Sequence, residues 1–122
     1  MADVHFGWPI VKEIGRLDIG QTVVVRRGSV MAVEAIDGTD ATIRRGGRLG
    51  RKQTVVVKAS KPTQDLRFDM PAVGIQTIET MREVGATVLA VEANRSLVFD
   101  REEMVKQANS SGIAILAIDE SK

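Results

Sequence analysis

The side chains best suited to phosphate chemistry are concentrated in one short segment, KPTQDLRFDMP. Pro62 and Pro71 fix their own φ angles and bias the preceding residues towards extended conformations, so we expect a stiff ribbon. Side chains alternate along extended backbone, which would point Asp65, Arg67 and Asp69 to one side. Two carboxylates beside a guanidinium suit a Mg²⁺-bound phosphate, because the carboxylates can bind the ion or orient water. The alternative is a solvated linker with a turn cap and a surface ion pair.

A second candidate is the stretch VEAIDGTDA, which ends one apolar run and opens a predicted helix. The unpaired N–H groups at a helix start, together with the hydroxyl of Thr39, would attract a phosphate. Asp40 in the first turn would compete with a bare anion but not with a metal-bound one, and Asp37 precedes the helix. Ordinary capping by Thr39 is the alternative.

A third candidate, RRGGRLGRK, begins at Arg44 and is basic and rich in glycine. Its spacing matches neither a P-loop nor a dinucleotide-binding fingerprint. It could close over a polyphosphate as a mobile flap, or it could be a solvated turn.

Composition narrows the chemistry. The 122 residues fit one domain, and they include no cysteine and one histidine, His5, which excludes Cys-based and His-rich metal sites. Any metal would therefore be a hard ion with oxygen ligands, such as Mg²⁺, Mn²⁺ or Ca²⁺. A net charge of +1 and few aromatic residues argue against a nucleic-acid binder. The sequence lacks a membrane-spanning apolar run and a recognisable signal peptide, so we expect a cytoplasmic protein.

The first half of the chain predicts four elements. A helix should start near Pro9, which is tolerated in a first turn, and end near residue 17. A β-hairpin follows, turning at residues 26–29, and then a helix of about two turns that runs from an N-cap at Thr39 to a stop at Gly46-Gly47. The apolar run of residues 53–60 predicts a buried strand.

The second half repeats the pattern. It predicts a helix of residues 74–84 closed by Gly85 and a hairpin of residues 86–100 with its tip at residues 94–95. A helix capped by Asp100 and a final strand of residues 113–118 complete it.

These elements predict an α/β fold, in part α+β-like, with a mixed β-sheet and packed helices. The two halves, residues 8–60 and 74–118, would be repeated αββαβ units, or their similarity would be coincidental alternation. The charged ribbon would then connect the two halves.

The motifs EAIDGTDA and KPTQDLRFDMP, with LDIGQTVVVRRGSVMAVEAIDG and GATVLAVEANRSLVFDREEM around them, closely resemble the C-terminal domain of the LpxI family. The resemblance covers nearly the whole chain. It implies a metal-dependent UDP-2,3-diacylglucosamine pyrophosphatase of lipid A biosynthesis, in which water attacks the α-phosphorus and releases UMP and lipid X. It implies Mg²⁺ or Mn²⁺, and a cytoplasmic location peripheral to the inner membrane.

The resemblance also implies roles for individual residues. Asp65, followed by Asp69, would be the catalytic aspartate. The residues expected to contact substrate are Lys61, Gln64, Arg67, Thr39 and Arg44, and the residues expected to bind metal are Asp65, Asp37 and Asp40.

Residues 1–122 would thus form the family's C-terminal domain, without its N-terminal Rossmann-like domain, which would be the partner across the lipid site. A homodimer through the uncovered surface is a further expectation. The alternative function is a non-catalytic module that binds the lipid sugar phosphate or mediates dimerisation.

Overall fold

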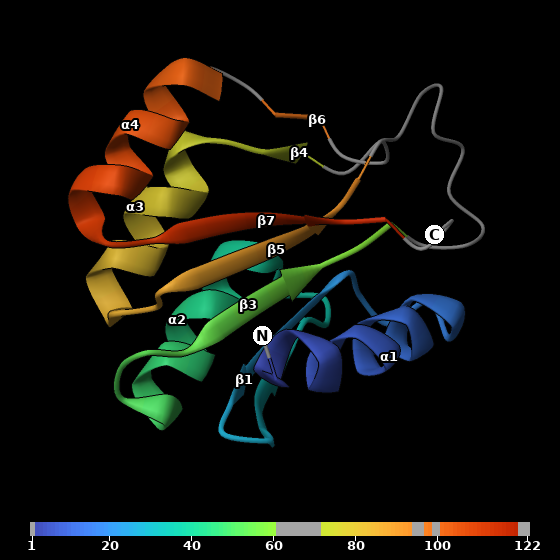
Figure 1. The fold of residues 1–122 in the computed structure, drawn as a ribbon. Helices are drawn as coiled ribbons and strands as arrows, with labels where there is room; N and C mark the ends of the chain where they lie inside the picture. The colour runs from blue at the N-terminus through green and yellow to red at the C-terminus, as the bar shows by residue number, and fades with distance from the viewer. Residues whose placement is uncertain (1, 61–71, 94–96, 99–100, 120–122) are drawn as a thin grey trace.

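The computed structural model describes residues 2–60, 72–93, 97–98 and 101–119. A five-stranded sheet lies between α1 on one face and α2, α3 and α4 on the other (Figure 1). This arrangement confirms the predicted α/β class with a mixed sheet. No helix within the described ranges is long and apolar enough to cross a membrane.

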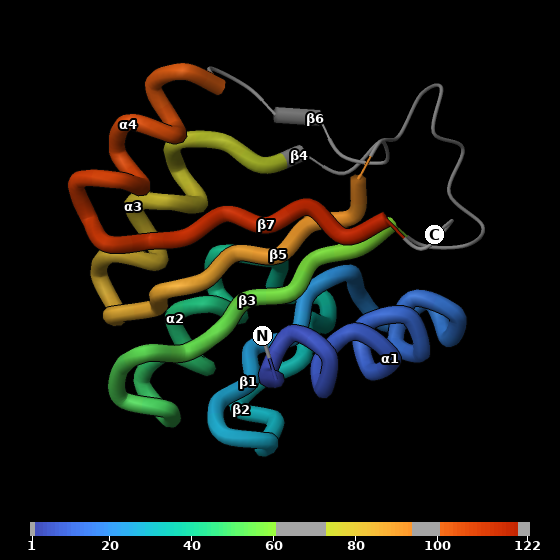
Figure 2. Tube along the Cα trace, in the orientation of Figure 1, coloured from blue at the N-terminus to red at the C-terminus, as the bar shows by residue number. Residues whose placement is uncertain are grey.

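Helix α1 (Ala2–Arg16) begins well before the predicted start, and Pro9 lies in its interior. Val4, Val11 and Ile14 fall on one face and are buried against the sheet. Helix α1 packs mainly on β1 and β3, and Figure 2 shows it beside these strands. Pro9 is exposed, so its ring lies away from this contact. A proline inside a helix costs about 3 kcal/mol, and the buried apolar face compensates for it. The prediction that the helix starts at Pro9 was therefore wrong.

The predicted hairpin is confirmed as β1 (Thr22–Arg26) and β2 (Ser29–Val33). Arg27 and Gly28 have positive φ angles of 50° and 72°, as a tight two-residue hairpin turn requires. Both of their N–H groups donate to the carboxylate of Asp3 at 2.9 Å. The first turn of α1 therefore holds the hairpin tip.

Helix α2 (Thr39–Gly50) is longer than predicted, because Gly46 and Gly47 do not end it. A Cβ atom at Gly46 would lie 2.6 Å from Cβ of Val24, and one at Gly47 would lie 2.3 Å from Cγ2 of Val84. These glycines allow α2 to pack closely on β1 and α3. In the sequence, a Gly-Gly pair that is needed for close packing looks the same as one that ends a helix. The predicted flap is likewise helical over most of its length.

The remaining strands of the main sheet are β3 (Val55–Lys58), β5 (Val88–Glu92) and β7 (Ala114–Ile118). The strand order is β2-β1-β3-β5-β7. Strands β3, β5 and β7 are parallel, whereas β1 is antiparallel to both β2 and β3. Each parallel strand therefore ends at the same edge of the sheet.

Helices α3 (Ile75–Val84) and α4 (Arg101–Ser111) cover the face that α2 also covers. Gly85 closes α3 with a φ of 74° and confirms the predicted stop. The predicted cap of α4, Asp100, lies outside the described residues.

A second, two-stranded sheet pairs β4 (Ala72–Val73) with β6 (Leu97–Val98) in parallel. The predicted hairpin of residues 86–100 was wrong, because β6 pairs with β4 and not with β5. Its predicted tip lies outside the described residues. The two halves thus share an order of elements, but their strands pair differently.

Candidate functional site

Charged and hydroxyl residues lie along the edge of the sheet where the parallel strands end. Lys58 and Glu92 are the last residues of β3 and β5, and Thr22 is paired with Lys58 at the start of β1. Glu34 follows β2, and Thr39 begins α2 beside it. We call these five residues the carboxyl edge. Ligands of α/β proteins commonly bind outside the carboxyl ends of such strands.

Lys58, Thr39 and Glu34 form a connected chain of polar contacts. Nζ of Lys58 donates to Oγ1 of Thr39 at 3.2 Å, and that hydroxyl lies 3.3 Å from Oε1 of Glu34 and 3.3 Å from the hydroxyl of Thr22. The predicted N-cap role of Thr39 was wrong, because Gly38 is the N-cap and no side chain caps α2. The Thr39 hydroxyl therefore faces the ammonium group and not the helix backbone.

Lys58 is buried, with 7% of the residue exposed. Desolvation lowers its pKa below the ordinary value, and the negative charges of Glu34 and Asp40 oppose that effect only in part. A phosphate oxygen arriving here would give the cation a further favourable partner. Asp40, a predicted metal ligand, is thereby placed near the carboxyl edge.

Glu92 forms a second polar group at the same edge, on the face of the sheet that α1 covers, and is only 4% exposed. Its Oε1 accepts the Ser60 N–H at 3.0 Å and the Ser60 hydroxyl at 2.7 Å, and its Oε2 accepts Nζ of Lys12 at 3.2 Å. Desolvation raises the pKa of Glu92, but the bonds from Ser60 and Lys12 outweigh it, so the pKa lies below its usual value. Lys12 also lies 5.8 Å from the ring centre of Trp8.

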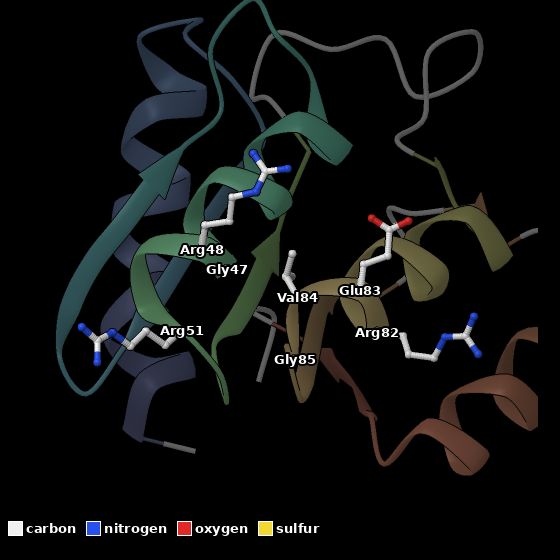
Figure 3. A pocket seen from close by; sticks show the side chains of 7 residues that line it. All are labelled: Gly47, Arg48, Arg51, Arg82, Glu83, Val84 and Gly85. Carbon is white, nitrogen blue, oxygen red and sulfur yellow. The ribbon is translucent and has the colours of Figure 1, made fainter.

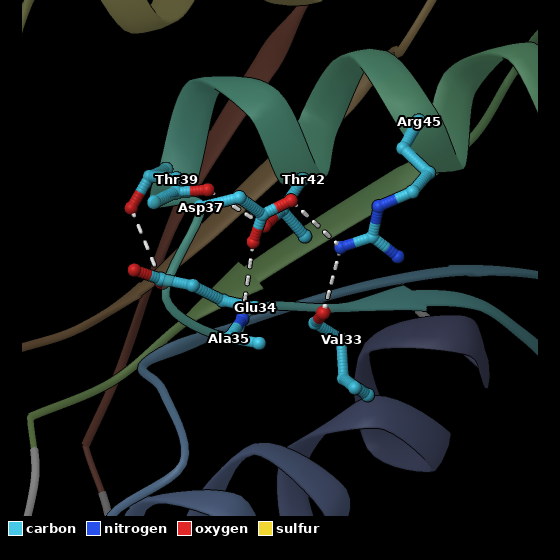
Figure 4. Close-up of polar contacts among 8 residues, drawn as sticks. Val33, Glu34, Ala35, Asp37, Thr39, Thr42 and Arg45 are labelled. Carbon is cyan, nitrogen blue, oxygen red and sulfur yellow. Dashed lines mark hydrogen bonds and ion pairs between the residues drawn. The ribbon is translucent and has the colours of Figure 1, made fainter.

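Asp37, another predicted metal ligand, has partners in its own loop and in α2 (Figure 4). Its carboxylate accepts the Ala35 N–H at 3.3 Å and Nη2 of Arg45 at 3.2 Å, and Arg45 also donates to the Val33 carbonyl at 3.0 Å. Desolvation raises the pKa of Asp37, yet these hydrogen bonds hold it below its usual value. The contacts fasten the entry into α2.

Arg44, the predicted substrate contact in α2, donates to Glu83 of α3 at 3.2 Å. The structure therefore does not join Arg44 to the carboxyl edge. Near the opposite edge, a hollow of about 560 Å³ is lined by Arg48, Arg51 and Arg82, whose guanidinium groups point in different directions (Figure 3). Divergent cations of this kind do not form a focused anion site.

A second hollow, of about 590 Å³, lies between α4 and β7. Met104, Val105 and Ile115 give it a largely apolar wall, and it extends to Glu92 at the carboxyl edge. It is therefore an apolar space next to a polar site.

Comparison with known proteins identifies the family. The family model described as LpxI C-terminal domain matches residues 1–116. This chain belongs to that family. It is 42% identical over 127 residues to the UDP-2,3-diacylglucosamine pyrophosphatase LpxI of Caulobacter vibrioides. The match covers 98% of this chain and 45% of that relative, so the chain spans less than half of the relative's length.

Several predicted LpxI site residues lie outside the described part of the chain. They are Lys61, Gln64, Asp65, Arg67 and Asp69. Within the described part, no three His, Cys, Asp or Glu side chains gather as metal ligands. The buried cation of Lys58 also acts on Glu34 and Asp40, which makes these two carboxylates alone a poor site for a divalent ion. The described residues therefore do not fit a metal by themselves.

Four residues at or beside the carboxyl edge of this LpxI domain were not predicted from the sequence: Glu34, Lys58, Ser60 and Glu92. Glu34, Lys58 and Glu92 directly follow apolar runs, in VMAVE, VVVK and VLAVE, and Ser60 comes two residues after Lys58. A charged residue that ends a buried strand is the signal that could have found them, once the strands were taken as parallel.

Proposed function

We propose that this chain is a domain of an enzyme that hydrolyses UDP-2,3-diacylglucosamine to UMP and lipid X, and that the carboxyl edge faces the diphosphate. The name of the Caulobacter relative supplies the substrate and the reaction class. The observation that carries the assignment to this edge is the buried ammonium of Lys58, held 3.2 Å from the Thr39 hydroxyl at the ends of the strands.

In the proposed reaction, Lys58 and Thr39 contact oxygens of the diphosphate. A buried cation stabilises the negative charge that develops during phosphoryl transfer more strongly than a solvated one would. Lys61, Gln64 and Arg67 are proposed as further phosphate or sugar contacts. Their segment is joined covalently to Ser60, which lies beside the carboxyl edge.

Asp65 is the proposed general base, with Asp69 as the second candidate. The base takes a proton from water, the water oxygen bonds to the α-phosphorus, and the bond from that phosphorus to the bridging oxygen breaks. Lipid X leaves with the bridging oxygen, and UMP keeps the oxygen of water. The atoms therefore balance without a further reactant.

Mg²⁺ or Mn²⁺ remains part of the proposal, with Asp65, Asp37 and Asp40 as predicted ligands. When bound, such an ion would neutralise charge on the diphosphate. Since the described residues do not form a metal site alone, ligands from residues 61–71 would have to complete it.

The apolar hollow beside Glu92 supports a lipid substrate. Its volume of about 590 Å³ falls within the range of about 300–1,000 Å³ of small-molecule sites. We propose that it receives part of an acyl chain, with the sugar phosphate towards the carboxyl edge. The same proposal has the protein touch the inner membrane from its cytoplasmic side. It also has an N-terminal domain cover the lipid site.

The test is UMP release by the full-length family protein that carries this chain as its C-terminal domain. Lys58→Met and Asp65→Asn should each reduce turnover by about 100-fold or more, whereas Arg48→Met, at the opposite edge, should leave turnover unchanged. Turnover within about threefold of the unmodified protein in both variants would reject the assignment. Tight lipid X binding without turnover in the unmodified protein would favour the binding-module alternative.

A further inference from the structure

We propose that Glu92 is a positioning residue for the reaction, which acts by holding Ser60 in place where the chain leaves β3. This inference rests on the proposed function. It concerns a residue that does not itself contact substrate and that acts through its neighbour.

The contacts of Glu92 show how the holding works. One carboxylate oxygen, Oε1, accepts both the backbone N–H and the hydroxyl of Ser60, at 3.0 and 2.7 Å. Both residues are buried, with Ser60 at 3% and Glu92 at 4% exposed. Two charge-assisted bonds shielded from water fix the backbone at Ser60 more firmly than a single exposed contact could.

The position of Ser60 gives this contact its functional meaning. The N–H of Ala59 donates to the Gln21 carbonyl at 3.0 Å, so hydrogen bonding to β1 continues up to the preceding residue. Beyond it, Glu92 of β5 receives the next N–H. Ser60 is two residues after Lys58 and one residue before Lys61, so Glu92 fixes the backbone between the two proposed groups of phosphate contacts.

The other oxygen of Glu92 has a separate partner. Oε2 accepts Nζ of Lys12 from α1 at 3.2 Å, which balances the buried negative charge. Oε1 therefore holds Ser60, whereas Oε2 binds the cation that balances the charge. The two roles can therefore be separated by substitution.

The first experiment measures kcat, KM and melting temperature in the full-length family protein with UDP-2,3-diacylglucosamine. Ser60→Ala and Glu92→Ala should each lower kcat by about 10- to 100-fold with KM changed by less than about threefold, since misplacement by about 1 Å can cost 100-fold. Glu92→Gln keeps an oxygen that can accept from Ser60, so it should restore kcat to within about threefold of the unmodified value.

Two controls separate positioning from stability. Lys12→Met leaves the Ser60 contacts in place, so it should lower the melting temperature and leave kcat unchanged. The double variant Glu92→Ala with Ser60→Ala should lose no more kcat than the worse single variant, because both act through one contact.

Three results would overturn the inference. They are an unchanged kcat in Ser60→Ala, multiplied losses in the double variant, or a kcat that falls with melting temperature in Lys12→Met. Absence of turnover in the unmodified protein would remove the proposed function and this inference together, which distinguishes that failure from the other three.

Discussion

Replacing Gly46 with alanine tests how closely α2 approaches the sheet. In an isolated helix this change is favourable by about 1 kcal/mol, because alanine is the better helix former. Here the added Cβ would lie 2.6 Å from Cβ and 2.7 Å from Cγ1 of Val24, a residue with 0% exposure. Carbon atoms normally pack at about 3.5–4.0 Å, so the helix or the strand must move by about 1 Å.

Overpacking of a core typically costs about 1–3 kcal/mol, and this contact is with the β-branched side chain of a fully buried valine, which cannot turn away easily. Contacts as short as 2.6 Å put the cost at the upper end of this range, so subtracting the gain of about 1 kcal/mol in helix propensity leaves an expected loss of about 2 kcal/mol in the free energy of unfolding. For a chain of 122 residues this corresponds to a melting temperature lower by roughly 6–10 °C. Urea unfolding followed by circular dichroism would measure the loss directly.

A second variant isolates the clash. Val24→Ala alone should destabilise by about 2 kcal/mol, because it leaves a cavity. Combined with Gly46→Ala, it makes room for the new methyl group, so the double variant should be more stable than the sum of the single effects by at least about 1 kcal/mol. A Gly46→Ala variant that is more stable than the unmodified chain would refute the close packing of α2 on β1.

Three further predictions concern charges. Asp3→Ala should lower the free energy of unfolding by about 0.5–1.5 kcal/mol, measurable by urea titration, because the hairpin N–H groups lose their acceptor; an equal loss in Asp3→Asn would argue against this cause. Folding lowers the pKa of Glu92, so its ionised carboxylate stabilises the folded state above a pH of about 4.3, the unfolded pKa. This stabilisation is lost as pH falls through the lower, folded pKa. In Glu92→Gln, the melting temperature measured as a function of pH should therefore change less across that acidic range. Folding also lowers the pKa of Lys58, so the folded state binds fewer protons than the unfolded state, and the free energy of unfolding should rise as pH increases towards about 10.4. In Lys58→Met this rise, followed by urea titration at several pH values, should be smaller. An equal rise in that variant would contradict the burial of Lys58.

The fold could be predicted from the sequence where local pattern and tertiary structure agree. The apolar runs that became β3, β5 and β7, the hairpin turn at Arg27 and Gly28, and the helix stop at Gly85 all follow from backbone preferences or hydrophobic periodicity. In each case the signal lies within a few residues of its structural effect.

The errors in the fold arose where distant contacts decide the outcome. Pro9 lies inside α1 because the sheet buries residues on both sides of it, and Gly46 lies inside α2 because Val24 needs the space. Strand β6 pairs with β4, a partner far away in sequence. Local propensity carries no information about such partners.

The candidate site was only partly accessible to sequence analysis. Thr39 and Asp40 were predicted, and the structure places them near Lys58, but the roles expected for Thr39 were a phosphate contact or a helix cap, and its contact with an ammonium group was not foreseen. Lys58 and Glu92 were missed, since the arrival of both strand ends at one edge depends on the parallel alignment of β3 with β5. The roles of residues 61–71 stay predictions.

The change from antiparallel to parallel pairing at β3 has a consequence for folding kinetics. Strands β1 and β2 pair across a tight turn, so their contacts have low contact order and should form early. Pairing of β3 with β5 aligns Val55 with Val88. It therefore brings together two strands that are separated by a long stretch of chain, which includes α3, and closing such a stretch costs entropy. Lys58 and Glu92 are brought to one edge only by that slower step, so the site should be among the last parts of the molecule to assemble.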